Sequence, residues 1–144
     1  MTNVSARLYA CAGALAVAAV LCLSPAATHA APVVAIVNIP FDFYVGAGKL
    51  PAGRYMVSHL SDPAVLRVYD GEGHVSVSFS IGISTSSTSN DAHLVFNRYG
   101  DQYFLSEVYW PGSSVARQLL KSSIETQIAK NSKPESVVAA TNNK

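Results

Sequence analysis

The sequence predicts an all-β domain: an antiparallel meander of seven or eight short strands that forms a small barrel or sandwich, with a short C-terminal helix. Apolar and polar residues alternate with a period of two along most of the chain, as they do in half-buried strands. Turn-forming Gly, Pro, Asp and Ser residues separate these runs. Runs that follow one another so closely can pair as neighbours, which favours a meander.

The first part of the domain supplies three strands. Residues 33–39 are β-branched and apolar, and Pro40 interrupts them because proline has no N–H to donate to a ladder. Residues 41–45 alternate, and residues 54–60 follow as a further strand. The segment between them, residues 46–53, is rich in glycine and proline and is expected to be a connection without strands.

Residues 64–69 and 74–83 predict a hairpin, because Asp70-Gly71 favours a two-residue type I′ turn. In that register Leu66 faces Val75. The apolar residues of the second strand then point to the core and the serines between them point to water. These apolar residues are Val75, Val77, Phe79, Ile81 and Ile83.

A second hairpin is expected around Gly100-Asp101, which suits a type II′ turn with glycine first. This register pairs Phe96 with Leu105 and Arg98 with Tyr103, and it places Glu107 on the face of Arg98. Apolar residues occur on both faces of this hairpin. We therefore expect it to be central in the sheet or covered by another element.

The C-terminal part is expected to hold a strand at residues 115–120, followed by a short helix. Ser122-x-x-Glu125 has the capping-box pattern that begins many helices. A competing interpretation is one helix over residues 115–130. Residues 131–144 are expected to be a disordered polar tail, so the single β domain spans residues 31–130.

Residues 1–30 have the pattern of a cleaved signal peptide. Arg7 precedes an uncharged apolar run that ends at Leu23, and Thr28-His-Ala30 offers a small-residue cleavage site. The mature chain would be periplasmic or secreted and would have no membrane span. Both cysteines would be removed with the signal peptide, so the mature protein would be free of disulfides. It would keep nine basic and nine acidic residues.

Three segments together carry a family resemblance: Ile39-Pro-Phe-Asp-Phe-Tyr-Val-Gly46, Leu50-Pro-Ala-Gly-Arg-Tyr-Met-Val57 and Leu94-Val-Phe-Asn-Arg-Tyr-Gly-Asp-Gln-Tyr-Phe-Leu105. In this order they resemble a family of small, uncharacterised exported bacterial proteins with the motifs PFDFxVG, LPAGxY and RYGDxYFL. The resemblance covers most of the mature chain. It implies an exported protein and brings no activity, ligand or catalytic residue.

The strongest candidate site is a polar group in an aromatic setting. It consists of Arg98, Tyr103, Glu107 and Trp110, which could hold an apolar or carbohydrate ligand, because aromatic rings offer a broad face to such groups. The competing interpretation, which we favour, is that Arg98, Tyr103 and Glu107 form a structural cluster. Asp42 is expected to pair with Arg54 and hold the connection at residues 46–53. No metal site, cofactor or catalytic group is expected, since no His-x-His pair occurs and both cysteines lie in the signal peptide.

These observations favour a non-catalytic exported domain of the cell envelope, structural or ligand- or partner-binding. Nucleic-acid binding is not expected, because the basic residues are scattered and phosphate neutralisation needs a basic face. One alternative is a lipocalin-like carrier of a small molecule inside a closed barrel. Another is a small hydrolase that uses carboxylates such as Asp42 and Glu107, or a histidine.

Overall fold

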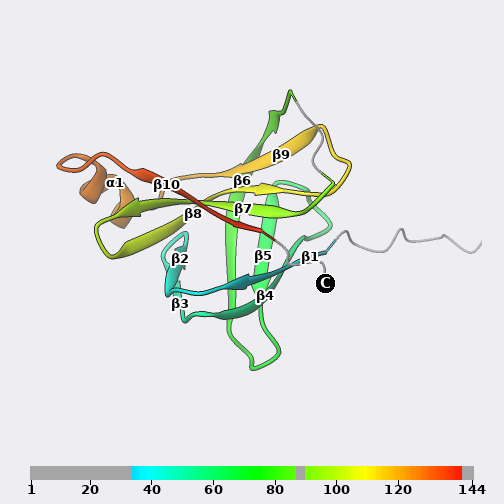
Figure 1. The fold of residues 1–144 in the computed structure, drawn as a ribbon, viewed down its shortest axis with the longest axis horizontal. Coiled ribbons are helices and arrows are strands. Elements are labelled where there is room, and N and C mark those ends of the chain that lie inside the picture. Colours follow the sequence, from blue (N-terminus) through cyan, green and yellow to red (C-terminus); the bar gives the residue numbers. More distant parts are fainter. Residues whose placement is uncertain (1–33, 87–89, 141–144) are drawn as a thin grey trace, which may run out of the picture. The chain divides into compact units, whose positions relative to one another are not determined.

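The computed structural model describes residues 34–86 and 90–140 (Figure 1). The expected signal peptide lies outside the described residues. These form ten strands and one α-helix: β1 (Ala35–Ile39), β2 (Phe43–Val45), β3 (Gly48–Leu50), β4 (Gly53–His59), β5 (Val65–Tyr69), β6 (Val75–Ser84), β7 (His93–Tyr99), β8 (Gln102–Tyr109), β9 (Val115–Leu119), α1 (Ser123–Ala129) and β10 (Glu135–Ala140). The predicted all-β class and the C-terminal helix are confirmed.

The strands make one mixed sheet in the order β1-β4-β5-β6-β9-β8-β2-β3, with β7 paired to β8 and β10 paired to β7. In β6, residues 75–79 pair with β5 and residues 80–84 pair with β9. This long strand therefore joins the β1–β4–β5 part of the sheet to the β9–β8–β7–β10 part.

The topology corrects three details of the expected meander. The described residues contain ten strands instead of seven or eight, and β2 pairs with β8 in parallel. The sheet also does not close into a barrel. Its end strands β1 and β10 contact each other, but the described residues form no ladder between them. Closure depends on strand tilt and stagger, which the period of the sequence does not encode.

Strand β3 lies where a connection without strands was expected, and it forms a short hairpin with the expected strand β2. Phe43 faces Leu50 in its ladder, and both side chains are buried. Gly46 has φ +60° at the turn, a conformation that glycine adopts without steric cost. The glycine-rich composition of the segment therefore marks a tight turn inside a hairpin.

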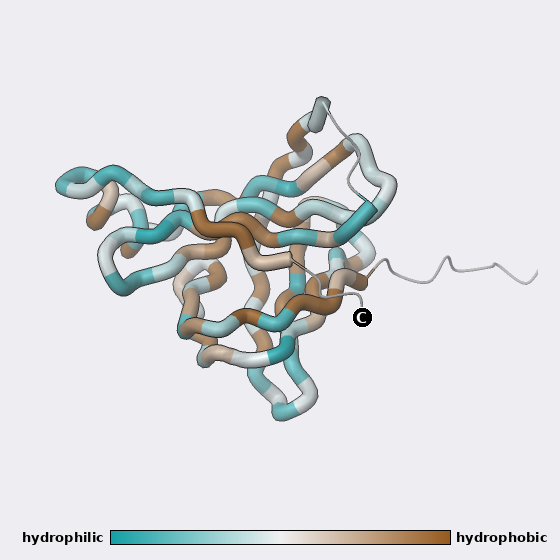
Figure 2. Tube along the Cα trace, viewed as in Figure 1, coloured by the Kyte–Doolittle hydropathy of each residue, from teal (hydrophilic) through white to brown (hydrophobic). Residues whose placement is uncertain are grey.

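The expected disordered tail is also corrected, because residues 135–140 form β10. Val137 faces Phe96 and Ala139 faces Leu94 in the ladder with β7. Figure 2 shows the hydrophobic colouring along this strand within a polar C-terminal region. The composition of residues 131–144 as a whole is polar, but a strand needs only a few apolar residues on one face.

One core lies between the two parts of the sheet. Its largest fully buried side chains are aromatic and include Phe43, Tyr55 and Phe96. The Phe43 ring packs edge-on against Tyr55 and Phe96, with centroid distances of 5.1 and 5.5 Å. Tyr55 Oη donates a hydrogen bond to the Pro51 carbonyl at 2.9 Å. Large side chains from distant strands thus fill the interior.

The β5–β6 hairpin has a different register from the expected one, and this correction reverses the two faces of β6. Leu66 faces Ser78 instead of Val75, three residues further along the strand. An odd shift moves every side chain of a strand to the opposite face. Ser78 and Ser80 therefore lie in the interior, while Val77 and its apolar neighbours point outward.

The turn between β5 and β6 explains this register. Asp70 Oδ1 accepts hydrogen bonds from the backbone N–H groups of Glu72 and His74, both at 2.9 Å. The Asp70 N–H donates to the His74 carbonyl at 3.1 Å. Gly73 takes the left-handed backbone conformation, with φ +100°. These bonds stabilise a turn over residues 70–74 in place of a two-residue turn.

The serines fit the interior because the β2–β3 hairpin packs closely against β6. Ser76 Oγ donates to the Val45 carbonyl at 3.0 Å, and Ser80 Oγ donates to the Ala64 carbonyl at 3.1 Å. A Cβ atom on Gly48 would lie only 2.6 Å from Ser76 Oγ. Small residues on both sides permit this approach, and the backbone carbonyls satisfy the buried hydroxyls.

The β7–β8 hairpin follows the expected register at its turn, where Phe96 faces Leu105, Arg98 faces Tyr103 and Gly100 has φ +61°. The helix α1 begins at the N-cap residue Ser122, as expected, and contacts the second face of the hairpin through Glu125. The Glu125 N–H donates to Ser122 Oγ at 3.2 Å. The Glu125 side chain is buried and accepts a hydrogen bond from Asn97 Nδ2 at 2.8 Å.

Candidate functional site

Arg98 and Tyr103 lie together, as the sequence predicts, at the turn end of the β7–β8 hairpin. The guanidinium carbon of Arg98 is 5.6 Å from the centre of the Tyr103 ring, within the range of a cation–π contact. Arg98 Nε donates to the Gly100 carbonyl at 2.8 Å, and Nη1 is 3.4 Å from Glu135 Oε2. Arg98 therefore ties the hairpin turn to β10.

Glu107 does not share the face of Arg98, which corrects the expected polar group. The register of the hairpin shifts between Val95 and Phe96, whose partners are Glu107 and Leu105. Ser106 is the extra residue of this β-bulge, and one inserted residue turns the following side chains to the other face. There Glu107 Oε2 accepts a hydrogen bond from Tyr109 Oη at 2.7 Å, and this bond raises the pKa of Tyr109.

Trp110 belongs to the core and is only 6% exposed. Its ring packs edge-on against His59, with a centroid distance of 5.8 Å. Both rings border a surface pocket of about 370 Å³ that Arg117 also lines. Trp110 Nε1 is buried and has no hydrogen-bond partner within residues 34–86 and 90–140. The structure thus places Trp110 apart from the Arg98–Tyr103 pair, on the loop between β8 and β9.

Asp42 pairs with Lys49 instead of the expected Arg54. The two charged groups are 3.2 Å apart and both side chains are more than half exposed. Asp42 Oδ1 also accepts a hydrogen bond from the Ala52 N–H at 3.1 Å. This backbone hydrogen bond, followed by the contact with Lys49, lowers the pKa of Asp42. The carboxylate therefore holds the β3–β4 connection.

The most unusual surface is the side of β1, β4, β5 and β6 that faces away from the core. Residues that lie opposite one another in an antiparallel ladder share a face, so the registers of these strands define its members. We call this surface the outer face, with the apolar members Ile36, Met56, Val65, Tyr69, Val75, Val77, Phe79 and Ile81.

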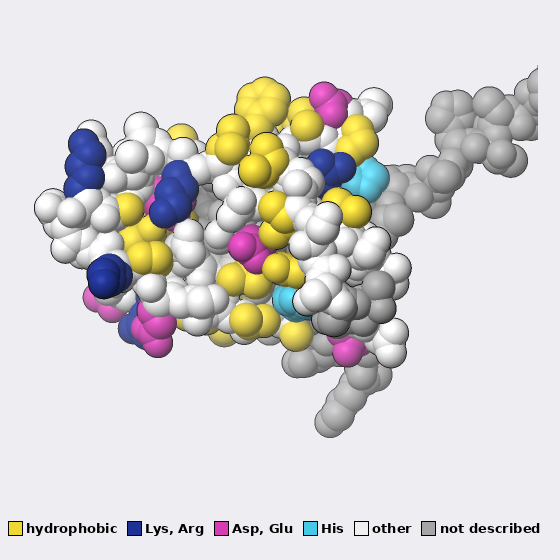
Figure 3. All heavy atoms as spheres, turned by 90° about the horizontal axis from the view of Figure 1, so that it is seen from above, with side chains coloured by type: hydrophobic (Ala, Val, Ile, Leu, Met, Phe, Trp, Pro, Cys, Tyr) yellow, Lys and Arg dark blue, Asp and Glu magenta, His cyan; other side chains and the backbone are white. Residues whose placement is uncertain are grey.

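The outer face exposes large apolar side chains. Its β6 members Val75, Val77, Phe79 and Ile81 are 56%, 51%, 66% and 49% exposed. Antiparallel sheets with one face on the core normally present polar residues on the other. Figure 3 shows hydrophobic side chains, in yellow, at several places on the surface seen from above the view of Figure 1, with charged side chains among them. Contiguous apolar surface of this kind marks interaction sites.

Arg67 lies in the middle of the outer face, between Ser58 and Val77 in the ladders. Its guanidinium carbon is 4.3 Å from the centre of the Tyr69 ring. Arg67 Nε is buried without a hydrogen-bond partner, and none of the ion pairs in the described part of the chain includes this residue.

The β5–β6 turn at the end of the outer face gathers three groups of metal-ligand type. The ligand atoms of Asp70, Glu72 and His74 lie within 4.8 Å of one another, and Asp70 Oδ2 is 2.6 Å from His74 Nδ1. Burial alone would raise the pKa of Asp70, but the hydrogen bonds from His74 and from the backbone of Glu72 outweigh burial and lower it. Because both Asp70 oxygens already accept hydrogen bonds, we assign this group to the turn.

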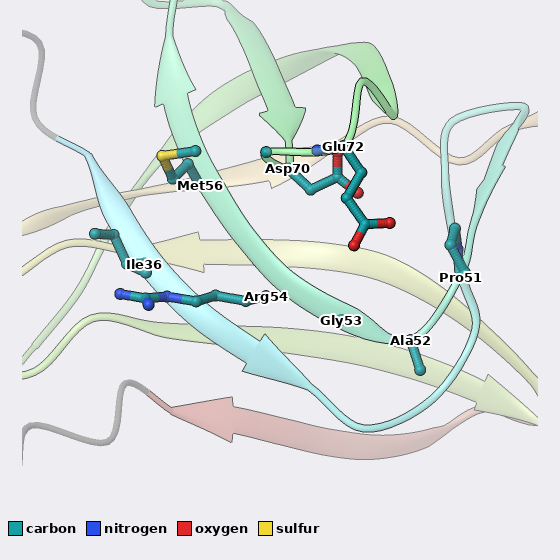
Figure 4. A pocket seen from close by; sticks show the side chains of 9 residues that line it. Ile36, Pro51, Ala52, Gly53, Arg54, Met56, Asp70 and Glu72 are labelled. Atoms are coloured by element: carbon teal, nitrogen blue, oxygen red, sulfur yellow. The ribbon is translucent and has the colours of Figure 1, made fainter.

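A pocket of about 390 Å³ separates this turn from β1 and β4. Figure 4 shows Ile36, Arg54 and Met56 on the two strands, with Asp70 and Glu72 on the turn. The pocket thus combines apolar walls with one cation and two carboxylates. It borders the outer face through Ile36 and Met56.

Comparisons with known proteins add no relative: no family model, curated protein or solved structure matches the chain. The resemblance to a family of exported proteins stays a prediction from its motifs. Within residues 34–86 and 90–140, no helix has the length and apolar character to cross a bilayer.

Sequence reasoning missed the outer face for one reason. The alternation along residues 75–83 predicts a strand with two different faces, but a two-residue turn at Asp70-Gly71 predicts the wrong direction for them. The sequence contained a usable signal in its glycines, because Gly46 and Gly48 indicate that two backbones approach closely. Small residues on β6 are what such an approach requires.

Proposed function

We propose that this protein is an exported, non-catalytic β-domain of the cell envelope that binds a protein partner through its outer face. The observation that carries the proposal is the direction of β6, which turns Val75, Val77 and Phe79 away from the core. Exposed apolar side chains on a regular sheet gain free energy when a partner removes them from water.

The carboxylates of the domain support a non-catalytic role. Asp42 pairs with Lys49, Glu107 accepts from Tyr109 and Glu125 accepts from Asn97. Each carboxylate therefore holds a turn, a strand or the helix in place. Export is supported by the signal-peptide pattern of residues 1–30.

Site-specific photo-cross-linking in cells tests the binding surface. The photoreactive residue p-benzoylphenylalanine replaces Phe79 in the full chain, and a matched variant carries it at Val138, which is 60% exposed on β10. We expect ultraviolet light to produce a protein adduct from position 79 and none from position 138. No adduct at position 79, or the same adducts from both positions, would contradict the proposal.

Export has a separate test. Cells that produce the full chain are fractionated, and the mass of the protein is measured in the envelope and medium fractions. We expect a chain that begins at Ala31 in one of these fractions. A chain that keeps residues 1–30 in the cytosolic fraction would show that the protein is not exported.

A further inference from the structure

We infer that a pocket between β4 and β9 binds a small organic carboxylate with an apolar ring, whose charged end Arg117 holds. We call it the Arg117 pocket. It is lined by His59 of β4, by residues 110–113 of the β8–β9 loop, and by Val115 and Arg117 of β9. Its volume of about 370 Å³ lies in the range of small-molecule sites. This site is separate from the outer face, so the inference goes beyond the proposed function and does not depend on it.

Arg117 lies on the core-facing side of β9, where charged residues are uncommon. In the ladders it faces the fully buried Val108 and Gly82. Residues opposite one another in a ladder share a face. His59 lies on the core-facing side of β4 for the same reason, because it faces the buried Leu66. Two polar side chains from different strands therefore meet at the pocket beside the core.

Gly82 leaves room for the Arg117 side chain. It lies within β6 and its φ is not positive, so no turn requires a glycine there. A Cβ atom at this position would lie 3.5 Å from Arg117 Nη1 and 3.6 Å from Val115 Cγ1. A glycine inside a strand often marks a place where another group approaches closely. The guanidinium therefore lies against bare backbone, next to the pocket that it lines.

The charge of the pocket favours an anion. Its described lining contains one permanent cation, Arg117, and no carboxylate. No ion pair within residues 34–86 and 90–140 includes Arg117. A guanidinium presents a planar fork of N–H donors that matches a carboxylate. The pocket at the β5–β6 turn differs, because two carboxylates accompany its cation.

The remaining walls suit an apolar ring. The Trp110 and His59 rings pack edge to face, and Pro111 and Val115 add aliphatic groups. Aromatic and aliphatic walls with a few polar groups are typical of small-molecule sites. His59 also has a ring N–H donor in its neutral and in its charged form. A carboxylate on an aromatic or other apolar ring uses all of these groups.

Fluorescence tests the site directly, because Trp110 is the only tryptophan of the chain. Benzoate is titrated into the purified protein at constant ionic strength, and benzyl alcohol provides the same ring without the negative charge. We expect benzoate to change the Trp110 emission along a saturable curve, with a dissociation constant on the order of 1 mM for so small a ligand. Benzyl alcohol should bind at least about tenfold more weakly.

Substitutions of Arg117 test its role in binding. Arg117→Gln should raise the dissociation constant for benzoate at least about tenfold. Arg117→Lys should have a smaller effect, because an ammonium keeps the charge but loses the fork. Lys133→Gln removes one positive charge from an exposed position before β10 and should leave the dissociation constant unchanged. Circular dichroism confirms that each variant is folded.

Three results would overturn the inference. Equal binding of benzoate and benzyl alcohol, or no response to benzoate, would show that the pocket does not select a carboxylate, and this comparison needs only the wild-type chain. Equal losses in Arg117→Gln and Lys133→Gln would show that overall charge, and not Arg117, attracts the anion. A response to glucuronate without one to benzoate would contradict the apolar ring, because glucuronate carries its carboxylate on a sugar.

Discussion

The hairpins β5–β6 and β7–β8 share one property of their sequences and have different surroundings. Each carries apolar residues on both faces. In β7–β8 one face meets the core, and on the other α1 places Glu125 against Asn97 while Tyr44 stacks on Phe104 at 4.8 Å. In β5–β6 the second face is the exposed outer face. The comparison teaches that the same apolar pattern can be met within the chain, as in β7–β8, or left exposed, as in β5–β6, where we propose that a partner binds.

The turns of the two hairpins also differ in how they set the register of the strands. At Gly100, a positive φ and a short connection give the register that the sequence predicts. At Asp70, a side chain captures two backbone N–H groups and widens the turn. The first turn leaves the expected faces unchanged, and the second reverses them.

The largest expected effect is a difference in stability loss between a substitution in the core side of β7 and one in the outer face of β6. Phe96→Ala removes a fully buried ring and should lower the free energy of unfolding by about 3–5 kcal/mol. Phe79→Ala removes an exposed ring and should change it by less than about 1 kcal/mol. Urea denaturation at low protein concentration measures both. Equal losses would mean that Phe79 is packed within the monomer.

The next effect concerns the internal cover of β7–β8. Glu125→Ala leaves Asn97 Nδ2 without its acceptor in a partly buried place and should cost about 1–3 kcal/mol. Glu125→Gln retains an oxygen acceptor and should cost less. Urea denaturation and amide exchange of α1 measure the change. If the amides of α1 stay protected from exchange in Glu125→Ala, another contact holds the helix in place.

A smaller effect tests whether the serine side chains of β6 point toward the interior or toward water. Gly48→Ala places a Cβ atom 2.6 Å from Ser76 Oγ and should destabilise the domain by about 1 kcal/mol. Ser76→Gly in the same chain removes the clash and should recover part of this loss. Thermal unfolding of the single and double variants measures the coupling. Additive losses would indicate that Ser76 faces water, as the sequence alone suggests.

The smallest effect concerns pH and the β5–β6 turn. The folded state lowers the pKa of Asp70 from its ordinary value of 3.8. The stability that the Asp70 carboxylate contributes to the fold is therefore complete above this ordinary pKa and is lost as the pH falls through the lower pKa of the folded state. Asp70→Asn keeps an acceptor but takes up no proton, so its melting temperature should fall less steeply in acid. Asp101→Asn, in the exposed turn of β7–β8, should keep the wild-type slope. Identical slopes for all three proteins would remove Asp70 from the acid response.

Much of the fold could be predicted from local patterns. The period of two, the Gly100-Asp101 turn and the Ser122 cap each depend on neighbouring residues, and all three are present in the structure. Of the candidate site, the Arg98–Tyr103 pair could be predicted for the same reason. Glu107 could not, because the bulge at Ser106 depends on how two strands pair over several residues.

By itself, the sequence determined an all-β domain with a capped C-terminal helix and a tight hairpin at Gly100, because short-range contacts dictate these features. Only the tertiary structure decided which side of β6 meets the core. Alternation shows that a strand has two different faces, but not which face turns inward. The Asp70 turn and the close approach of Gly48 to Ser76 settle that choice. They leave Phe79 and its apolar neighbours on the outside, where a partner can bind them.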